Sequence, residues 1–590
     1  MNFLKVLLAS CLGTLLALVV LFLVAAGFIG KAISDTDDTV RIGSNSVLRL
    51  DLPAVMPELT GNMQSGNLSL DNSEELGLYD VMRSIRRAAE DNNIKGIYLN
   101  QGFFNAQPAT VRQLRQELLA FRETGKFVVA FSPNYGQAGY YLASAADAVY
   151  VGPMGILDFR GLGAEIPFMK DMLDRIGVNM EVFYVGDYKS ATEPLRYTEM
   201  SRENREQTKI FLENLFDLIV DDIAVSRNLS PAGVRGMAAN ITGWREQELL
   251  SSGLIDGFMH RSEVEAEIRS RLGLEENRNI NTVGLSDYFE ARLNKQLGGH
   301  DQVRVIVAEG TIVDGSGDYG SIGDRKYVEL IQDARRDDLV KAVVLRINSG
   351  GGSASSSENI WAAVEDLKAA GKPVVVSMSD VAASGGYYIA AGADSIFAQP
   401  STITGSIGVF NVFPDATGLM KEHIGINFDT VNTAPYANAF SPFQGLSDTE
   451  RTLLTQRAQI IYDQFLERVS TGRDIPMDRM RQIARGRVYS GVDALDLGLV
   501  DRLAGLDEAI ASAASLAGLD NYSMGFYPRV TPPLERFVND LMGLSDSDGG
   551  FNVNLVREQL GEQAYQHFEL MRDLTQMQGV QARMPIVVKF

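Results

Sequence analysis

Cysteine and histidine are nearly absent from this sequence. The single cysteine, Cys11, excludes an intrachain disulfide framework and any zinc site built from cysteines. The four histidines are scattered without metal-ligand spacing, and none lies within 30 residues of Ser384, a candidate nucleophile. This argues against a Ser-His-Asp triad, although folding could still bring a distant histidine to a serine. We expect no metal and no cofactor.

Basic residues are outnumbered by acidic ones. Lysine and arginine total 54 against 75 aspartates and glutamates, which gives a formal net charge of −21. A nucleic-acid-binding protein needs basic patches to meet phosphates, so we expect no nucleic-acid partner. The hydrophobic content of 45% and charged content of 22% are those of an ordinary globular protein. A chain of 590 residues suggests roughly three or four structural units.

Charged residues are missing altogether from residues 6–30. An apolar stretch of this length can cross the roughly 30 Å hydrocarbon core as a helix, and it is longer than a signal-peptide core. The flanking charges weakly favour a cytoplasmic N-terminus with the rest of the chain outside. The alternative is a lipoprotein cleaved before Cys11 in L-A-S-C, which would leave a very short apolar run ahead of the cysteine. We expect a retained membrane anchor and a linker over residues 1–40.

Two stretches of the chain resemble each other. The first begins at Gln137 and reads Q-A-G-Y-Y-L-A-S-A-A-D, and the second begins at Ser384 and reads S-G-G-Y-Y-I-A-A-G-A-D. At the same offset, Lys189 of the first copy corresponds to Tyr436 of the second. One copy therefore holds a candidate nucleophile and the other a candidate base, which suggests a duplicated domain with complementary functional halves.

Alternating strand and helix patterns support the duplication. In the first copy we expect strands at 47–52, 95–99 and 127–131 and helices at 78–89 and 108–124; in the second, extended or strand segments at 303–313, 342–347 and 373–378 and helices at 328–334 and 358–369. Helical extensions follow at 203–226 and 448–472. This alternation predicts parallel βαβ units and an α/β fold class.

These patterns divide the chain into four parts. An anchor and linker (1–40) precede a first repeat domain that carries the lysine (41–290). A second repeat domain carries the serine (291–527), and a C-terminal tail covers residues 528–590. The tail has a predicted helix at 556–577 and ends in an apolar V-V-K-F, a candidate final strand.

Ser384 directly follows an apolar strand and begins a helix of small residues. The N–H groups at a helix N-terminus favour a developing oxyanion, and Gly385 and Gly386 allow a substrate backbone to approach closely. The alternative is an ordinary serine N-cap. The motif differs from G-x-S-x-G because Ala382 takes the place of the first glycine.

A second candidate element is N-S-G-G-G-S at residues 348–353, which follows the strand A-V-V-L-R-I. Consecutive glycines at the end of a strand can present backbone N–H groups to a ligand. The corresponding loop of the first copy, N-Q-G-F-F-N at 100–105, lacks this run. The glycines and the serine are thus absent from the same copy. A flexible turn without a role is the alternative.

Lys189 lies in G-D-Y-K-S-A-T-E-P and is the candidate activator of the serine, because histidine is scarce. Its pKa would have to fall from about 10.4 to roughly 7–8, and burial can supply such a change. Asp187 and Glu193 would oppose that change, so both must point away from the amine. The alternative is a solvated surface lysine.

Two further patterns have simpler interpretations. G-S-G-D-Y-G at 315–320 matches a dinucleotide-binding fingerprint, but no suitable ribose-binding acid follows it, and we interpret it as a turn. The Tyr-Tyr pairs at 140–141 and 387–388 occur in both copies, which favours packing over catalysis.

Three motifs together resemble the signal peptide peptidase A (protease IV) family in its long, duplicated, membrane-anchored form. They are G-D-Y-K-S-A-T-E-P around Lys189, V-A-A-S-G-G-Y-Y around Ser384, and S-T-I-T-G-S-I-G at 401–408. The resemblance implies two tandem Clp-protease/crotonase-like domains built from ββα spiral units. It also implies Ser384 as the nucleophile, Lys189 as the general base and Ser406 as a hydrogen-bond partner of the lysine amine.

The resemblance further implies an oxyanion hole made by the backbone N–H groups of Gly385 and Gly351. One departure is visible, because Gly350 stands where the family's N-S-P-G-G loop has proline. In the first copy Phe159 lies opposite Ser406, so that copy lacks this serine as well.

The same resemblance implies a serine endopeptidase that degrades cleaved signal peptides and other short or unfolded polypeptides. It implies a homotetramer, held by a single span in the cytoplasmic (inner) membrane, with its catalytic domains on the periplasmic face. Two alternatives stay open at this point. One is a crotonase-like acyl-CoA enzyme whose glycine loop serves a thioester enolate, and the other is an inactive membrane scaffold of the same fold.

Overall fold

The structure is a computed structural model and describes residues 41–53, 56–61, 76–293, 300–317, 320–529 and 580–584. The anchor predicted at 6–30, the tail helix predicted at 556–577 and the final V-V-K-F lie outside these residues. Among the helices that the structure does describe, none is both long and apolar enough to cross a membrane.

The first repeat is built on a sheet of parallel strands in the order β8-β5-β3-β2-β1-β9. The strands are β1 (Ser46–Leu50), β2 (Ile94–Leu99), β3 (Phe127–Ser132), β5 (Ala148–Val151), β8 (Gly257–Phe258) and β9 (Asn281–Gly284). Helices α2 (Leu78–Glu90) and α3 (Pro108–Glu123) connect the first strands and bury apolar side chains such as Ile85 and Leu118 in the core. The strand and helix alternation predicted for this repeat is confirmed.

The second repeat has the same strand order, β20-β16-β15-β13-β10-β21, again with parallel pairing. Its strands are β10 (Gln302–Glu309), β13 (Val340–Ser349), β15 (Val374–Ala383), β16 (Ser395–Ala398), β20 (Arg502–Leu503) and β21 (Ser523–Tyr527), and its first helices are α12 (Asp324–Arg336) and α13 (Ala354–Ala369). Strand β15 continues past the predicted end at residue 378 because its last residues pair with β17 (Ile403–Gly405). The duplication predicted from sequence is therefore a duplication of structure.

The paired tyrosines close each repeat in the same way. The hydroxyl of Tyr140 donates to the carbonyl oxygen of Leu254 at 2.7 Å, and that of Tyr387 donates to Leu499 at 2.8 Å. Both tyrosines are fully buried, and the acceptors lie in similar segments near the end of each repeat, 241–256 and 487–501. The prediction that these residues serve packing is confirmed.

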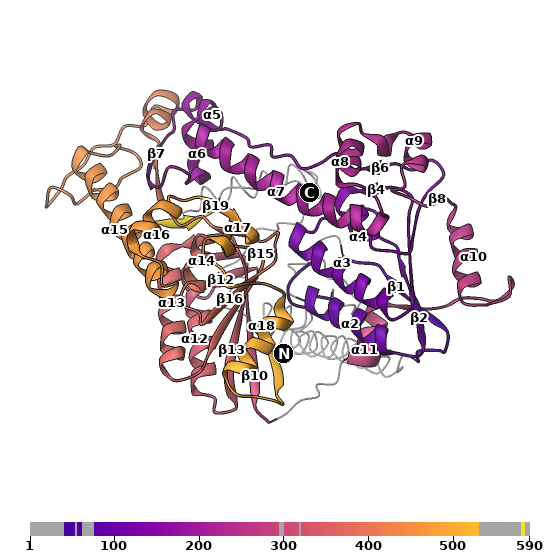
Figure 1. Cartoon of the computed structure of the whole chain (residues 1–590). Coiled ribbons are helices and arrows are strands. Elements are labelled where there is room, and N and C mark those ends of the chain that lie inside the picture. The colour runs from indigo at the N-terminus through magenta and orange to yellow at the C-terminus, as the bar shows by residue number, and fades with distance from the viewer. Residues whose placement is uncertain are drawn as a thin grey trace, which may run out of the picture.

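An arm of the first repeat crosses to the second. Strand β7 (Asn179–Val185) pairs antiparallel with β18 (Val409–Asp415) of the second repeat. In Figure 1 the segment with α5 (Lys170–Arg175), α6 (Glu193–Arg196) and β7 lies over the second repeat, and α7 (Arg202–Arg227) runs back across the top towards the first. The sequence between β7 and α7 contains Lys189, so this crossing carries the lysine away from its own repeat.

Apolar contacts fasten the arm to the second repeat. Phe211 and Leu215 of α7 form a buried cluster with Ile403 of β17 and Val488 of β19 (Val488–Ser490). Complete burial of one such side chain is worth about 1.5–3 kcal/mol. The helix begins at a serine cap, because the Oγ of Ser201 accepts the N–H of Asn204. The second extension, α15 (Asp448–Gly472), matches the helix predicted at 448–472. It also begins with a serine N-cap, Ser447.

Buried polar pairs also join the N-terminal part of the chain to the second repeat. Arg346 of β13 forms an ion pair with Glu58 at 2.9 Å, and the two side chains are 1% and 4% exposed. The N–H of Thr110 in α3 donates to Asp380 of β15 at 2.8 Å, and its hydroxyl donates to the other carboxylate oxygen at 2.5 Å. Asp380 is four positions before Ser384, so the contact between repeats is anchored close to the candidate nucleophile.

Candidate active site

Ser384 occupies the turn between strand β15 and helix α14 (Gly385–Ala390). Its backbone has φ 54° and ψ −117°, a region that side-chain-bearing residues rarely adopt and that costs about 1–3 kcal/mol. Its N–H donates to Gly405 at 2.8 Å, which holds the turn against β17. The side chain makes no capping hydrogen bond to α14. The ordinary N-cap interpretation therefore does not describe this serine.

The amine of Lys189 meets the hydroxyl of Ser384. Its Nζ lies 2.7 Å from the Oγ of Ser384, 3.0 Å from the carbonyl oxygen of Ser406 and 3.1 Å from the Oγ of Ser406. Lys189 is 1% exposed and Ser384 is fully buried, so the surface-lysine interpretation does not hold. The contact forms within one chain, between residues of the two repeats.

This contact geometry suits an uncharged amine. A neutral amine has two N–H donors and one lone pair. Ser406 offers two oxygen acceptors, its carbonyl and its hydroxyl, and the lone pair is then left for the Ser384 hydroxyl proton. Burial lowers the pKa of Lys189 well below its ordinary value, because the charged form loses its hydration.

The two nearby carboxylates point elsewhere. Glu193 accepts hydrogen bonds from the N–H of Ser201 at 3.1 Å, the hydroxyl of Ser201 at 2.5 Å and the side-chain amide of Asn204 at 2.8 Å. Asp187 forms an ion pair with Arg485. The condition that both carboxylates face away from the lysine amine is met, and nothing there restores the ammonium form.

Glycines allow the lysine segment to fit against the second repeat. The N–H of Tyr188 donates to Arg485 at 3.0 Å, and Gly486 follows directly with φ 76°. A Cβ at Gly486 would lie 2.7 Å from both the N and the Cβ of Lys189, closer than real Cβ atoms come. A side chain at this position would displace the lysine, so the position of Lys189 requires glycine at 486, a residue that the sequence patterns did not single out.

Ser406 is fixed in position by its backbone and by burial. It follows β17, has φ 52°, and its N–H donates to Arg487 at 2.6 Å. It is fully buried, and its Oγ reaches the lysine amine as described above. The structure therefore brings together all three side chains that the motifs indicated.

The glycine loop forms β14 (Gly351–Ser353) beside the serine. The N–H of Gly351 donates to the Oγ of Ser349 at 3.1 Å, so the donor expected for the oxyanion hole already has a partner. Gly352 pairs with Ala582 of an antiparallel neighbouring strand, β22 (Gln581–Arg583). A Cβ at Gly352 would lie 2.0 Å from the carbonyl oxygen of Ile312, so only glycine fits there.

Asp314 clamps the end of the glycine loop. Its Oδ1 accepts the hydroxyl of Ser353 at 2.7 Å, that of Ser355 at 3.4 Å and that of Ser356. The hydrogen bonds from Ser356 and Ser353 lower the pKa of this carboxyl. The next residue, Gly315, begins the stretch interpreted as a turn, and its N–H is bound by Asp324 at 2.7 Å.

The first repeat lacks this chemistry at the corresponding place. The Oε1 of Gln137 accepts the N–H groups of Gly161 at 2.9 Å and Arg160 at 3.2 Å. Phe159, opposite Ser406, is buried and packs against Tyr140 with ring centroids 6.1 Å apart. The side chains of Gln137 and Phe159 therefore occupy the positions that Ser384 and Ser406 take in the second repeat, and neither is a nucleophile.

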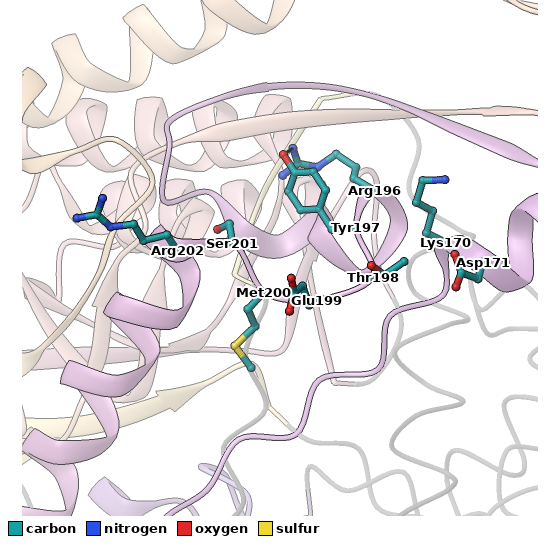
Figure 2. A pocket seen from close by; sticks show the side chains of 9 residues that line it. All are labelled: Lys170, Asp171, Arg196, Tyr197, Thr198, Glu199, Met200, Ser201 and Arg202. Atoms are coloured by element: carbon teal, nitrogen blue, oxygen red, sulfur yellow. Dashed lines mark hydrogen bonds between the residues drawn. The ribbon is translucent and has the colours of Figure 1, made fainter.

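A shallow surface pocket lies on the crossing arm, lined by Lys170, Asp171 and residues 196–202. Figure 2 shows its side chains spread over α5, α6 and the start of α7. Neither Lys189 nor Ser384 lines it. Its one serine, Ser201, donates to Glu193, so we assign no catalysis to this pocket.

The chain is similar to known peptidases over both repeats. The model of peptidase family S49 matches residues 120–275 and 366–520, once in each repeat and together more than half of the chain. Protease 4 of Salmonella typhi is 35% identical over 483 residues, covering 80% of this chain and 78% of that protein. The chloroplastic serine protease SPPA of Arabidopsis thaliana is 30% identical over 552 residues, covering 92% and 78%. A solved ClpP1 variant from Listeria monocytogenes covers 35% of this chain and 94% of its own, at 14% identity and a TM-score of 0.23.

Proposed function

The chain belongs to peptidase family S49 and is a serine peptidase, and we propose that it cuts peptide bonds with Ser384 as nucleophile and Lys189 as general base. The observation that carries this proposal is the 2.7 Å separation of the lysine amine and the serine hydroxyl, two side chains that are both buried. This pair requires both repeats, which explains why neither copy retains a complete set of catalytic residues.

Acylation follows from the positions of these groups. The neutral amine of Lys189 takes the hydroxyl proton as the Oγ of Ser384 attacks a peptide carbonyl carbon. The resulting ammonium is held by the two oxygens of Ser406 and then protonates the leaving amine. A water molecule hydrolyses the ester in the same way, with the lysine again acting as base. We assign Ser406 as a positioning residue for the amine.

We place the oxyanion at the start of α14. The N–H of Gly385 directly follows the nucleophile and belongs to the first turn of the helix. We assign the second donor to Gly352 rather than Gly351, because the Gly351 N–H is bound to Ser349. Removing one such donor typically costs ~10²–10³ in rate, so this pair is a substantial part of the mechanism.

The wider setting is also part of the proposal. The motif resemblance supports cleaved signal peptides and other short or unfolded polypeptides as substrates. It also supports the single-span anchor at residues 6–30, attachment to the cytoplasmic membrane with periplasmic catalytic domains, and a homotetramer. The parallel order of both sheets fits two tandem Clp-protease/crotonase-like domains at 41–290 and 291–527, with the tail at 528–590.

A serine-reactive phosphonate probe tests the dyad directly. We expect labelling at Ser384 in the full chain, located by peptide mass spectrometry, and none in Ser384→Ala. Lys189→Ala should lose labelling while circular dichroism shows the fold unchanged. Gln137→Ala, at the matched position of the first repeat, should label as the parent does. Equal labelling of the Lys189→Ala chain would refute the role of the lysine.

A further inference from the structure

A carboxylate at the end of a neighbouring strand holds the glycine loop in place. Strand β11 (Thr311–Val313) pairs in parallel with β14 through Ile312 and Gly352, and Asp314 directly follows β11. The Oδ1 of Asp314 accepts the hydroxyl of Ser353, the last residue of β14, at 2.7 Å. The glycine loop is therefore held twice at this edge, once by the backbone of β11 and once by the side chain that follows it.

Ser353 links this carboxylate to the helix that follows the loop. It is the N-cap of α13, and its Oγ accepts the N–H of Ser356 at 3.3 Å, which leaves its own proton for Asp314. The hydroxyl of Ser356 also donates to the Oδ1 of Asp314. We call the contacts of Asp314 with Ser353 and Ser356 the serine clamp. Both serines are buried, so loss of the carboxylate leaves two hydroxyls without water to replace it.

The first turn of α13 reaches both proposed oxyanion donors. At one end, Ser353 directly follows Gly352 in the chain. At the other end, the hydroxyl of Ser357 donates to the carbonyl oxygen of Ser353 at 2.8 Å, and a Cβ at Gly385 would lie 2.7 Å from the Oγ of Ser357. The serine clamp on Ser353 therefore fixes the position of Gly352 relative to Gly385.

The matched helix of the first repeat begins differently. Helices α3 and α13 both have 16 residues, and they follow the corresponding strands β2 and β13. The N-cap of α3 is Gln107, whose side chain makes no capping hydrogen bond, and the next two residues have no hydroxyl. Thr110, at the place of Ser356, donates to Asp380 of the second repeat. The serine clamp thus belongs to the copy that carries the proposed nucleophile.

We propose that Asp314 is a positioning residue for the oxyanion hole, an inference that rests on the proposed function. By holding Ser353, it orients the N–H of Gly352 towards the oxygen of the peptide carbonyl that Ser384 attacks. The negative charge on that oxygen exists only after attack, so a fixed N–H contributes more to the transition state than to the bound substrate. Loss of the serine clamp frees the end of the loop and misaligns one of the two donors without removing it.

Peptide kinetics of two variants at residue 314 test this role. Complete loss of one oxyanion donor typically costs ~10²–10³ in rate, and a misaligned donor should cost less. We therefore expect Asp314→Ala to lower kcat about tenfold, with KM within about twofold of the parent. Asp314→Asn keeps an oxygen at Oδ1, where the serine hydroxyls bind, and should retain about half of the parent kcat or more. Equal kcat in Asp314→Ala and the parent would overturn the proposal.

A peptide aldehyde separates effects on the transition state from effects on substrate binding. It adds to the Oγ of Ser384 and forms a tetrahedral adduct whose oxygen occupies the oxyanion hole. Its inhibition constant should rise in Asp314→Ala by the factor by which kcat/KM falls. The acid limb of the pH profile should stay in place, because the amine of Lys189 is held by Ser406 and not by the serine clamp. A shift of that limb together with a higher KM would indicate general loosening of the site and would overturn the assignment.

Two further variants separate the serine clamp from ordinary helix capping. Ser353→Ala removes the same contact from its other side, so adding Asp314→Ala to it should cause no further loss of kcat. Additive losses would mean that Asp314 does not act through Ser353. Ser230→Ala is the control for a lost cap, because its Oγ accepts the N–H of Gly233 at 3.1 Å at the start of α8 (Pro231–Ala239) in the first repeat. It should lower the urea midpoint and leave kcat and the aldehyde inhibition constant unchanged.

These outcomes also separate the inference from the proposed function. A parent chain that hydrolyses a peptide in a Ser384-dependent way, with kcat and aldehyde inhibition unchanged in Asp314→Ala, would overturn the positioning role alone. A parent chain that hydrolyses no peptide and takes no phosphonate label would overturn both.

Discussion

The two repeats share a framework and differ at the positions where chemistry would occur. Both have the same strand order and the same tyrosine-to-backbone closure through Tyr140 and Tyr387. Where the third strand turns into a helix, the second repeat has Ser384 at φ 54°. The first has Gln137, whose side chain accepts hydrogen bonds from loop backbone and whose φ is not positive. At this turn, backbone strain is present only in the copy with the proposed nucleophile.

The repeats also differ at the position of the lysine. The first repeat extends an arm whose β7 pairs with β18, and this arm delivers Lys189 to the second repeat. Tyr436 occupies the position of the second repeat that matches Lys189. It is 57% exposed, whereas an amine base must be buried for its pKa to fall. The proposed base therefore comes from one copy and the proposed nucleophile from the other, and the two meet where the copies are in contact. The difference between the repeats shows that each fold depends on packing within its own repeat. The candidate site depends on contact between the two repeats.

Removing the nucleophile should have the largest effect on this comparison. Ser384→Ala should lower kcat/KM for a peptide substrate by on the order of 10⁶-fold, because the hydroxyl on which we propose the acyl intermediate forms is removed. Gln137→Ala should leave kcat within twofold, since its side chain serves only its own repeat. A comparable loss in both variants would mean that the first repeat also takes part in catalysis.

The lysine should show opposite effects on rate and stability. Lys189→Met should lower kcat by about 10²–10⁴-fold, because general base catalysis is lost. The pKa of Lys189 is lowered in the folded protein, so the unfolded chain binds its proton more tightly and folding is disfavoured below the unfolded pKa of about 10.4. Methionine removes that cost, and the urea midpoint at pH 7 should rise. A midpoint that falls would contradict a neutral, buried amine.

The pH profile of the parent chain also tests whether Lys189 is neutral when it acts. The reaction needs the neutral amine, so kcat/KM should rise with pH as Lys189 loses its proton and level off well below pH 10. The acid limb reports the free enzyme. An activity that rises only near pH 10 would indicate an ordinary solvated lysine.

Breaking the contact between repeats should cost stability rather than chemistry. Glu58→Ala leaves the guanidinium of Arg346 buried without its carboxylate, which typically costs about 3–5 kcal/mol. The matched control is Glu248→Ala, whose partner Arg245 is exposed, where about 0–1 kcal/mol is expected. Urea unfolding of the two variants measures the difference, and equal losses would show that the buried pair does not join the repeats.

Much of this arrangement could be predicted from sequence because it depends on local patterns. Apolar periodicity placed the strands and helices of both repeats, and the repeat comparison identified Ser384 and Lys189. The full length of β15 could not be predicted in this way, because residues 381–383 pair with β17, a strand further along the chain. The choice between Gly351 and Gly352 as the proposed oxyanion donor could not be made from sequence, because the direction of a backbone N–H depends on the loop conformation and not on residue type. The segment V-Q-A-R at 580–583 has no strong strand pattern, and its partners are remote in sequence.

The smallest effect is expected at Ser406, where the two repeats offer another matched pair. Ser406→Ala removes one of two oxygens that hold the lysine amine, a hydrogen bond that is worth about 1.5–3 kcal/mol when the amine becomes charged. We expect kcat to fall roughly 10–100-fold with KM unchanged, because the contact strengthens as the ammonium forms. The acid limb of the pH profile should move to lower pH, since the ammonium loses an acceptor. Phe159→Leu, at the position of the first repeat matched to Ser406, changes only apolar packing and should leave kcat and the acid limb in place. A change in KM alone at Ser406, or the same loss of kcat in both variants, would assign the effect to general loosening of the fold rather than to the positioning of Lys189.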